Sequence, residues 1–276
     1  MRALIAVALF LIVAAIAAFY AAAPWIERSI ASHPAQHDPQ QPWTLPPATT
    51  DVFFTSDGVR LNGWFLDATA PRNGITVLML HGAGSNVATA ANDALFLRNK
   101  GFDVFLIDYR GYGRSAGASE GEATLQLDGA AALRYLVDER HVDPATIVLL
   151  GMSLGTAVAT DISLWSPCRA IVLISPLSSA RDLAEILYPY LPTFLYKEQL
   201  SSKFNVAGKI AGARCPVLIV HGERDVSFMQ GVAVYDAAHS PKRFIAVPTG
   251  GHNLPLVDGT DYSQQIVDAL KTGRIN

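Results

Sequence analysis

Short apolar runs with almost no polar interruption recur along the chain between residues 75 and 250. They read ITVLMLHG, FDVFLIDY, TIVLLGMS, RAIVLISP, PVLIVHG and RFIAVPTG, at residues 75–82, 102–109, 146–153, 169–176, 216–222 and 243–250. Runs of this length without alternation are typical of strands that are buried on both faces. We therefore expect these segments to form the centre of one sheet.

The segments between several of these runs have a different period. Residues 121–140, for example, repeat apolar side chains at helical spacing. Strands that alternate with helices predict a mostly parallel sheet with helices on both faces. Residues 51–69 instead contain two strand-like runs separated by Ser-Asp-Gly at 56–58, which predicts a hairpin and an antiparallel N-terminal edge. The pattern as a whole predicts one α/β domain over residues 51–276.

The longest apolar run lies at the N-terminus, where residues 3–26 contain no charged side chain. At about 1.5 Å per residue, a helix of this length crosses a hydrocarbon core of ~30 Å. We predict a transmembrane signal anchor over residues 1–26; a cleaved signal peptide, which would give a secreted protein, and a buried helix are the alternatives. Arg2 precedes the span, so the positive-inside rule predicts that the rest of the chain lies on the extracytoplasmic side.

The next segment, residues 27–50, contains five prolines and shows no apolar period. Because proline fixes φ, we predict an extended and fairly stiff linker. His33 and His37 are four residues apart, as zinc ligands on a helix would be, but Pro34 lies between them. The segment is not expected to be helical, and we predict no metal site here.

Composition narrows the class of protein. Half of the 276 residues are hydrophobic and 16% are charged, so a sizeable core is expected and wholesale disorder is not. The formal net charge of −3 is spread without a block of like charges. A nucleic-acid-binding surface would require a basic stripe, and none is present in the sequence.

Polar side chains follow the predicted strands at their carboxyl ends, where ligands bind in open α/β sheets. Ser153 lies there between Gly151 and Gly155, Asp225 follows the fifth run, and His252 follows the last. A serine hydroxyl is a weak nucleophile that needs a base within hydrogen-bond reach. We predict that His252 is this base and that Asp225 holds its imidazole in the productive tautomer.

A nucleophilic serine of this kind has further requirements. It must project from a sharp strand-to-helix turn, and Gly151 and Gly155 are expected to provide the clearance. An acyl intermediate also needs two preorganised donors for its oxyanion. We predict the backbone N–H of Leu154, at a helix start, and that of Ala83, in a glycine-rich turn, as these donors.

These segments together resemble the α/β-hydrolase family over essentially the whole predicted domain. The resemblance is carried by HGAGSN, DYRGYGRS, GMSLG, HGERD and GGHN, in that order. It implies the α/β-hydrolase fold, and the DYRGYGRS turn resembles a branch of small, nearly lidless, often membrane-tethered hydrolases that includes depalmitoylases and serine-aminopeptidase-like proteins. One departure is visible: the family often has Val-Pro after the acid, where this chain reads VSFMQG.

The resemblance also places a cap at residues 177–210, where the family inserts one. The segment is short but rich in large apolar residues, which line an acyl pocket or merely cover the core. In the first case the predicted substrate-binding residues are Leu187, Tyr190 and Phe194. An apolar rim on a membrane-tethered domain favours acyl chains or lipid-like esters.

The two cysteines, Cys168 and Cys215, precede runs that the family pairs as neighbouring strands. In an oxidising compartment they would be bridged if their Cα atoms lie within ~7 Å. The alternative is a pair of buried thiols.

Other interpretations of these motifs are weaker. Asp258 and Asp261 are alternative partners for His252. His81 is expected to orient the oxyanion loop, while Asp108 and Arg110 are expected to brace the turn after their strand.

HGAGSN also resembles a dinucleotide-binding turn, but Val87 replaces the third glycine of that motif. We therefore expect no cofactor.

The resemblance implies a membrane-anchored serine hydrolase that acts on carboxylic esters or thioesters of a small-molecule or acylated substrate through an acyl-Ser153 intermediate. An amidase or peptidase of the same fold is the alternative enzyme. An anchored interaction module without turnover is the non-enzymatic alternative.

Overall fold

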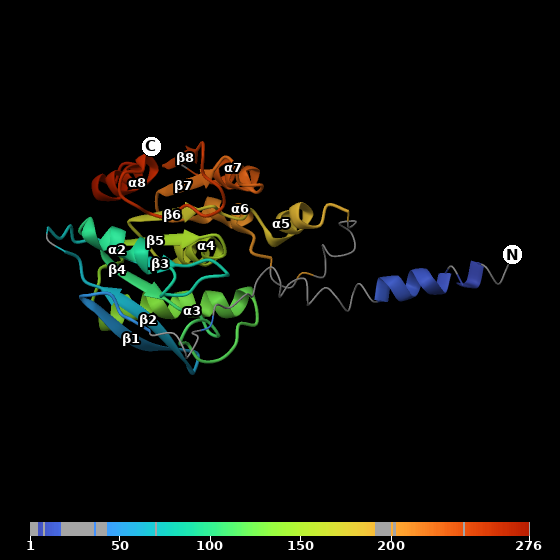
Figure 1. Ribbon diagram of the computed structural model, residues 1–276, viewed down its shortest axis with the longest axis horizontal. Coiled ribbons are helices and arrows are strands. Elements are labelled where there is room, and N and C mark those ends of the chain that lie inside the picture. The colour runs from blue at the N-terminus through green and yellow to red at the C-terminus, as the bar shows by residue number, and fades with distance from the viewer. Residues whose placement is uncertain are drawn as a thin grey trace.

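A computed structural model of the chain describes residues 5–7, 9–17, 36, 43–69, 71–190, 200, 203–239 and 241–275 (Figure 1). The predicted anchor and linker therefore lie largely outside the described residues. Residues 5–7 and 9–17 are helical. Within the described residues, no helix combines the length and the apolar character needed to cross a membrane.

In the described part of the chain, eight strands form one sheet in the order β1-β2-β4-β3-β5-β6-β7-β8. The pairs β1–β2 and β2–β4 are antiparallel, and all the other pairs are parallel. The strands are β1 Thr49–Ser56, β2 Val59–Leu66, β3 Thr76–Leu80, β4 Asp103–Ile107, β5 Ile147–Met152, β6 Ala170–Ile174, β7 Val217–Gly222 and β8 Lys242–Val247. The prediction of a mostly parallel sheet with an antiparallel N-terminal edge is confirmed.

The predicted hairpin is also confirmed. β1 and β2 are joined at Asp57 and Gly58, whose φ angles are +47° and +76°. Two central residues with positive φ match the right-handed twist of the flanking strands, which is why Asp-Gly is a strong hairpin signal.

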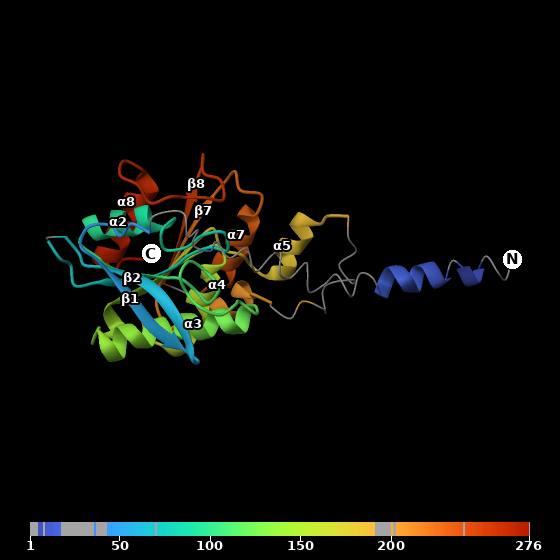
Figure 2. The same ribbon diagram turned by 60° about the horizontal axis from the view of Figure 1, so that its bottom comes forward.

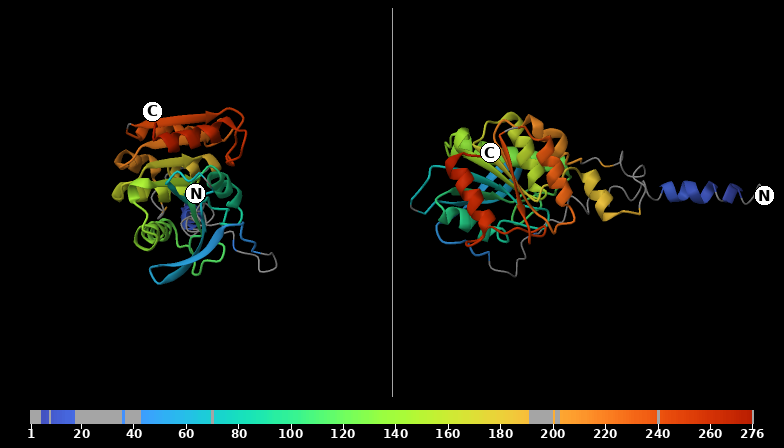
Figure 3. Two further views of the ribbon diagram at one scale, coloured as in Figure 1. Left: turned by 90° about the vertical axis from the view of Figure 1, so that its left-hand side faces the viewer. Right: turned by 90° about the horizontal axis from the view of Figure 1, so that it is seen from above.

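Helices cover both faces of the sheet (Figure 3, right). α2 and α8 contribute to the hydrophobic core on one face, while α3, α4, α5, α6 and α7 contribute to the core on the other. The helices are α2 Ala91–Asn99, α3 Glu122–Arg134, α4 Gly155–Trp165, α5 Ala180–Leu187, α6 Val206–Lys209, α7 Phe228–Ala237 and α8 Asp261–Thr272. α3 packs against β1 at the hairpin end of the sheet (Figure 2).

The continuous apolar runs follow from these two cores. Successive side chains of a strand point to opposite faces, so a strand covered on both sides needs apolar residues at every position. In β3, Leu78 and Leu80 join one core, while Val77 and Met79 join the other. All four side chains are fully buried.

The helical prediction over residues 121–140 is confirmed with a change of geometry. α3 ends at Arg134 and continues as a π-helical turn at Tyr135–Glu139. Short 3-10 turns lie at Pro144–Thr146 and Ile210–Gly212.

Cys168 and Cys215 form a disulfide, with their Cα atoms 5.6 Å apart. The bridge lies just before β6 and β7, which are parallel neighbours in the sheet. The bridged alternative of the sequence analysis is therefore the one that the structure contains.

Candidate active site

The site begins at the turn between β5 and α4. β5 ends at Met152, α4 begins at Gly155, and Ser153 between them has a φ of +49°. A positive φ is uncommon for a residue other than glycine and persists where the surroundings enforce it. Here the Ser153 N–H donates to the Ile174 carbonyl of β6 at 2.9 Å, which fixes the turn to the neighbouring strand.

The glycines on either side of this turn are required by close backbone contacts. A Cβ on Gly155 would overlap the Leu80 carbonyl oxygen of β3, and a Cβ on Gly151 would overlap the Gly155 carbonyl oxygen. In both cases the obstacle is backbone, which cannot rotate away as a side chain can. The clearance predicted for the two glycines is confirmed.

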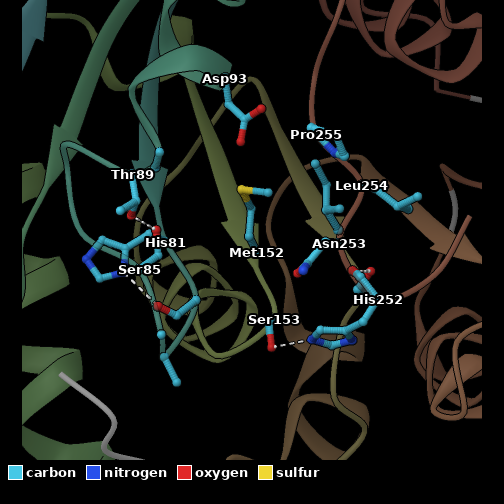
Figure 4. Close-up of a pocket in the computed structure, with 16 residues that line it drawn as sticks. His81, Ser85, Thr89, Asp93, Met152, Ser153, His252, Asn253, Leu254 and Pro255 are labelled. Atoms are coloured by element: carbon cyan, nitrogen blue, oxygen red, sulfur yellow. Dashed lines mark hydrogen bonds between the residues drawn. The ribbon is translucent and has the colours of Figure 1, made fainter. Parts of the chain in front are cut away.

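The three residues predicted to act together lie in one hydrogen-bonded chain. His252 Nε2 is 3.0 Å from Ser153 Oγ, and His252 Nδ1 is 2.6 Å from Asp225 Oδ2. Figure 4 shows the imidazole reaching toward the serine hydroxyl. The Asp225 side chain is 3% exposed and that of His252 is 43% exposed, so the acid is enclosed while the base faces the solvent-accessible side.

Two loops that are distant in the sequence hold the acid and the base together. The N–H of Arg224, in the loop after β7, donates to the Gly250 carbonyl in the loop after β8, at 2.9 Å. Ser175 Oγ, at the end of β6, donates to the His252 carbonyl at 2.7 Å. The base is thus fixed from two neighbouring strand ends.

His221, for which the sequence predicted no role, contacts the acid directly. This residue lies near the end of β7 and is completely buried, and its Nε2 is 2.9 Å from Asp225 Oδ2. Because a carboxylate oxygen accepts, the His221 hydrogen is on Nε2. The signal was the histidine of HGERD, which precedes the acid by four residues.

Asp225 is surrounded by donors. Besides the two histidines, the Ser227 N–H donates to Asp225 Oδ1 at 2.9 Å. Burial alone would raise the pKa of Asp225, but the hydrogen bonds from His221, His252 and Ser227 outweigh it and hold this pKa well below its usual range. The carboxylate is therefore charged and able to stabilise an imidazolium at His252.

The residues predicted for the oxyanion hole flank Ser153. A Cβ on Gly82 would lie 3.4 Å from the Ser153 Cβ, which places the loop that carries Ala83 directly beside the serine. Leu154 is the residue before the first turn of α4, where backbone N–H groups have no intrahelical acceptor. In the described part of the chain, no hydrogen-bond acceptor is found for the N–H of Ala83 or Leu154.

Buried polar residues hold the loop that carries Ala83 and the turn that follows β4. Asp108 Oδ1, after β4, accepts the Val87 N–H at 2.8 Å and lies 3.6 Å from His81 Nε2. Arg110 forms a buried ion pair with Asp128 of α3, with a closest distance of 2.7 Å. The bracing expected of Asp108 and Arg110 agrees with these contacts.

A cavity of about 580 Å³ opens beside Ser153 and His252 (Figure 4). Its lining is mixed in character. Apolar side chains of Met152, Ile174 and Leu254 face polar ones of Ser85, Thr89 and Asp93. The cavity therefore offers both apolar surface and hydrogen-bonding groups to a ligand.

Two of the three predicted substrate-binding residues do not lie at this cavity. Leu187 and Tyr190 are absent from its lining, and they are 51% and 97% exposed, respectively. Both come from the end of α5 and the turn after it, which face solvent. Phe194 lies outside the described residues.

The alternative acids have other partners. Asp258 pairs with Lys100 at 2.6 Å, and Asp261 accepts a hydrogen bond from Gln265 at 2.6 Å. Neither contacts His252. Over the described ranges, no group of three or more His, Cys, Asp and Glu side chains is arranged to hold a metal ion.

Comparisons with known proteins found a matching family and similar bacterial proteins. The model of the family described as serine aminopeptidase, S33, matches residues 71–210. A Mycobacterium tuberculosis protein called uncharacterized is 36% identical over 230 residues, covering 82% of this chain and 79% of its own. The YfhR protein of Escherichia coli K12 is 30% identical over 239 residues, covering 83% and 81%.

Among solved structures, the esterase Pf2001 of Pyrococcus furiosus is similar to this chain with a TM-score of 0.69 at 22% identity, covering 86% of this chain and 98% of its own. At this identity the likeness shows a shared fold. The residues of the site must therefore be judged on their own geometry.

Proposed function

This chain belongs to the α/β-hydrolase family, and we propose that it is a serine hydrolase that cleaves carboxylic ester or thioester bonds. The observation that carries the proposal is the continuous contact from Ser153 Oγ through His252 to the buried carboxylate of Asp225. A structural serine in a turn would need neither an imidazole at 3.0 Å nor an acid behind it.

In the proposed reaction, Ser153 Oγ attacks the substrate carbonyl carbon while His252 Nε2 takes its proton. The new oxyanion accepts hydrogen bonds from the N–H groups of Ala83 and Leu154. The bond to the alcohol or thiol then breaks, and His252 gives the proton to that leaving group. Water adds to the acyl-Ser153 by the same steps in reverse, with His252 first as base and then as acid.

Esters and thioesters rank first because an alcohol or a thiol leaves more readily than an amine. The similarity to a protein called an esterase supports this order, while the family description, serine aminopeptidase, supports an amide-cleaving alternative. We expect higher kcat/KM for p-nitrophenyl esters than for aminoacyl p-nitroanilides. A preference for the anilides would assign the site to the alternative.

The triad residues give the sharpest kinetic test. Asp225→Asn keeps the shape of the side chain but removes the charge, and we expect kcat to fall by about 10⁴-fold. His252→Ala should be similarly inactive. The His252 side chain is 43% exposed, so the unfolding temperature of His252→Ala should change little. Asp225→Asn should be less stable at neutral pH, because it loses the charge that accepts three hydrogen bonds. Near-normal turnover of Asp225→Asn would remove Asp225 from the mechanism.

We also propose that residues 1–26 anchor the domain on the extracytoplasmic side of a membrane. The Cys168–Cys215 bridge supports this location, because structural disulfides persist in oxidising compartments. A membrane location favours acylated or lipid-like substrates. Cell fractionation followed by N-terminal sequencing separates an anchored chain from one whose signal has been removed, and recovery of the full-length chain in the soluble fraction would contradict the proposal.

A further inference from the structure

The cavity beside Ser153 contains a carboxyl group that the proposed mechanism does not use. Asp93 lies in the first turn of α2 and lines the cavity together with Ser153 and His252. In Figure 4 its carboxyl points into the cavity, and Met152 lies between it and Ser153 in this view. One cavity therefore reaches from Ser153 to Asp93.

The two oxygens of Asp93 have different surroundings. Oδ1 accepts the Leu256 N–H at 2.7 Å, which ties α2 to the loop after His252. Oδ2 has no hydrogen-bonding or ionic partner in the described part of the chain. The side-chain oxygen of an asparagine would accept the Leu256 N–H equally well. A structural role therefore explains the hydrogen bond of Oδ1 but not the negative charge of Asp93.

Within the described residues, the charge of Asp93 has no positive side chain beside it in the cavity. No lysine or arginine lines the cavity among the described residues. Burial raises the pKa of Asp93 to about 6, although the hydrogen bond from Leu256 opposes the shift. At neutral pH the carboxylate is therefore mostly ionised, and a cationic group bound in the cavity would form an ion pair with it.

We propose that Asp93 is a specificity-determining residue whose carboxylate binds an amine on the ester substrate. The inference rests on the proposed function, since it assigns a substrate class to the same site. The apolar side chains of Met152 and Leu254 would pack on the methylene groups that separate the amine from the ester. An ammonium is preferred to a hydroxyl because it supplies both hydrogen bonds and the missing positive charge.

The test uses matched pairs of esters with equal numbers of heavy atoms. One pair varies the acyl part, as p-nitrophenyl 6-aminohexanoate and p-nitrophenyl heptanoate. The other pair varies the alcohol part, as the acetates of 6-aminohexanol and heptanol. The measured quantity is the ratio of kcat/KM for the amine-bearing ester to that for its alkyl match. Replacing the amine by a hydroxyl in each pair separates charge from hydrogen bonding.

In the wild type, we expect the amine-bearing ester to be preferred in at least one pair. Asp93→Asn should lower that ratio by at least about tenfold, because the amide cannot pair with the cation. The substitution should reduce kcat/KM for the amine-bearing ester and raise kcat/KM for the alkyl ester. Asp258→Asn removes the same charge from an exposed side chain paired with Lys100 and should leave the ratio unchanged.

A second readout is the pH dependence of the same ratio. The pKa of the amine is about 10.4, so the amine stays charged. The ratio should therefore rise with pH as Asp93 ionises around its pKa of about 6 in the wild type, and should stay flat in Asp93→Asn. Dividing the kcat/KM of one ester by that of its match cancels pH effects on the triad, because these act on both members of a pair. The other titratable side chains around Asp93 are His81 on the cavity wall and Tyr262 of α8, whose pKa is raised by its burial and, more weakly, by the charge of Asp93.

The inference is overturned if neither pair shows a preference for the amine, if the hydroxyl ester matches the amine, or if Asp93→Asn keeps the wild-type ratio. A structural role alone would change both members of a pair in parallel. Failure of the proposed function is distinguishable, because then Ser153→Ala would still hydrolyse all the esters at the wild-type rate.

Discussion

At the scale of single residues, Asp225 determines the electrostatics of the site. One of its oxygens lies within hydrogen-bond distance of two imidazoles, at 2.9 Å for His221 and 2.6 Å for His252. His221 is fully buried and lies outside the cavity lining, so we interpret it as a positioning residue that holds the acid. Its other ring nitrogen, Nδ1, faces Gly231 of α7, where a Cβ would overlap it. The glycine thus makes room for the buried ring.

The depressed pKa of Asp225 predicts how stability depends on pH. Its folded-state pKa is below the unfolded value of ~3.9, so the unfolded chain binds more protons and stability falls as pH falls from ~4 toward the folded pKa. Between pH 7 and pH 3, Asp225→Asn should therefore lose less free energy of unfolding than the wild type. Urea denaturation at each pH measures this difference. Equal losses in both proteins would show that Asp225 contributes nothing to acid sensitivity.

At the scale of elements, the turn between β5 and α4 depends on close backbone contacts. Gly155→Ala places a methyl against the Leu80 carbonyl of β3, and we expect it to lower the free energy of unfolding by about 1–3 kcal/mol. It should also displace Ser153 and reduce turnover. Gly84→Ala is the matched control for stability, because an added Cβ there meets no atom within 4 Å. Similar thermal unfolding of the two variants would contradict this role of Gly155.

The disulfide before β6 and β7 closes a loop of the unfolded chain. Cys168 and Cys215 are separated by 47 positions, so removing the bridge should cost about 4 kcal/mol in the chain-entropy model. We expect the double Cys→Ser variant to unfold at a lower temperature with unchanged kcat. Two free thiols in the non-reduced wild-type protein, detected by alkylation and mass spectrometry, would contradict the bridge.

Several elements were predictable from sequence because their causes are local. Strands with two buried faces need uninterrupted apolar runs, and the hairpin needs residues that accept positive φ, as Asp57 and Gly58 do. The serine turn was predictable because Gly151 and Gly155 flank it in sequence. The contact of Asp93 with Leu256 was not, because it joins segments that the fold alone brings together. His221 lies only four residues before Asp225, but the sequence does not show that the turn after β7 brings its ring back to the acid. In sequence, Asp93 is an ordinary acid in the first turn of a helix.

At the scale of the whole molecule, the fold brings the ends of four strands to one edge of the sheet. The oxyanion loop follows β3, the serine follows β5, the acid follows β7 and the base follows β8. The order of the motifs therefore predicted the triad, since parallel strands end at the same edge. The cavity was less predictable, because its walls combine side chains from separate loops with α2. The anchor over residues 1–26 remains a prediction.

The central claim is that Ser153 is a nucleophile activated by His252. The most direct measurement is labelling of the folded protein with a fluorophosphonate probe, followed by mass spectrometry of the modified peptide. We predict one adduct on Ser153 in the wild type, none in Ser153→Ala, and much slower labelling of His252→Ala. Equal labelling of the wild type and Ser153→Ala, or no labelling of a folded wild-type protein, would contradict the account.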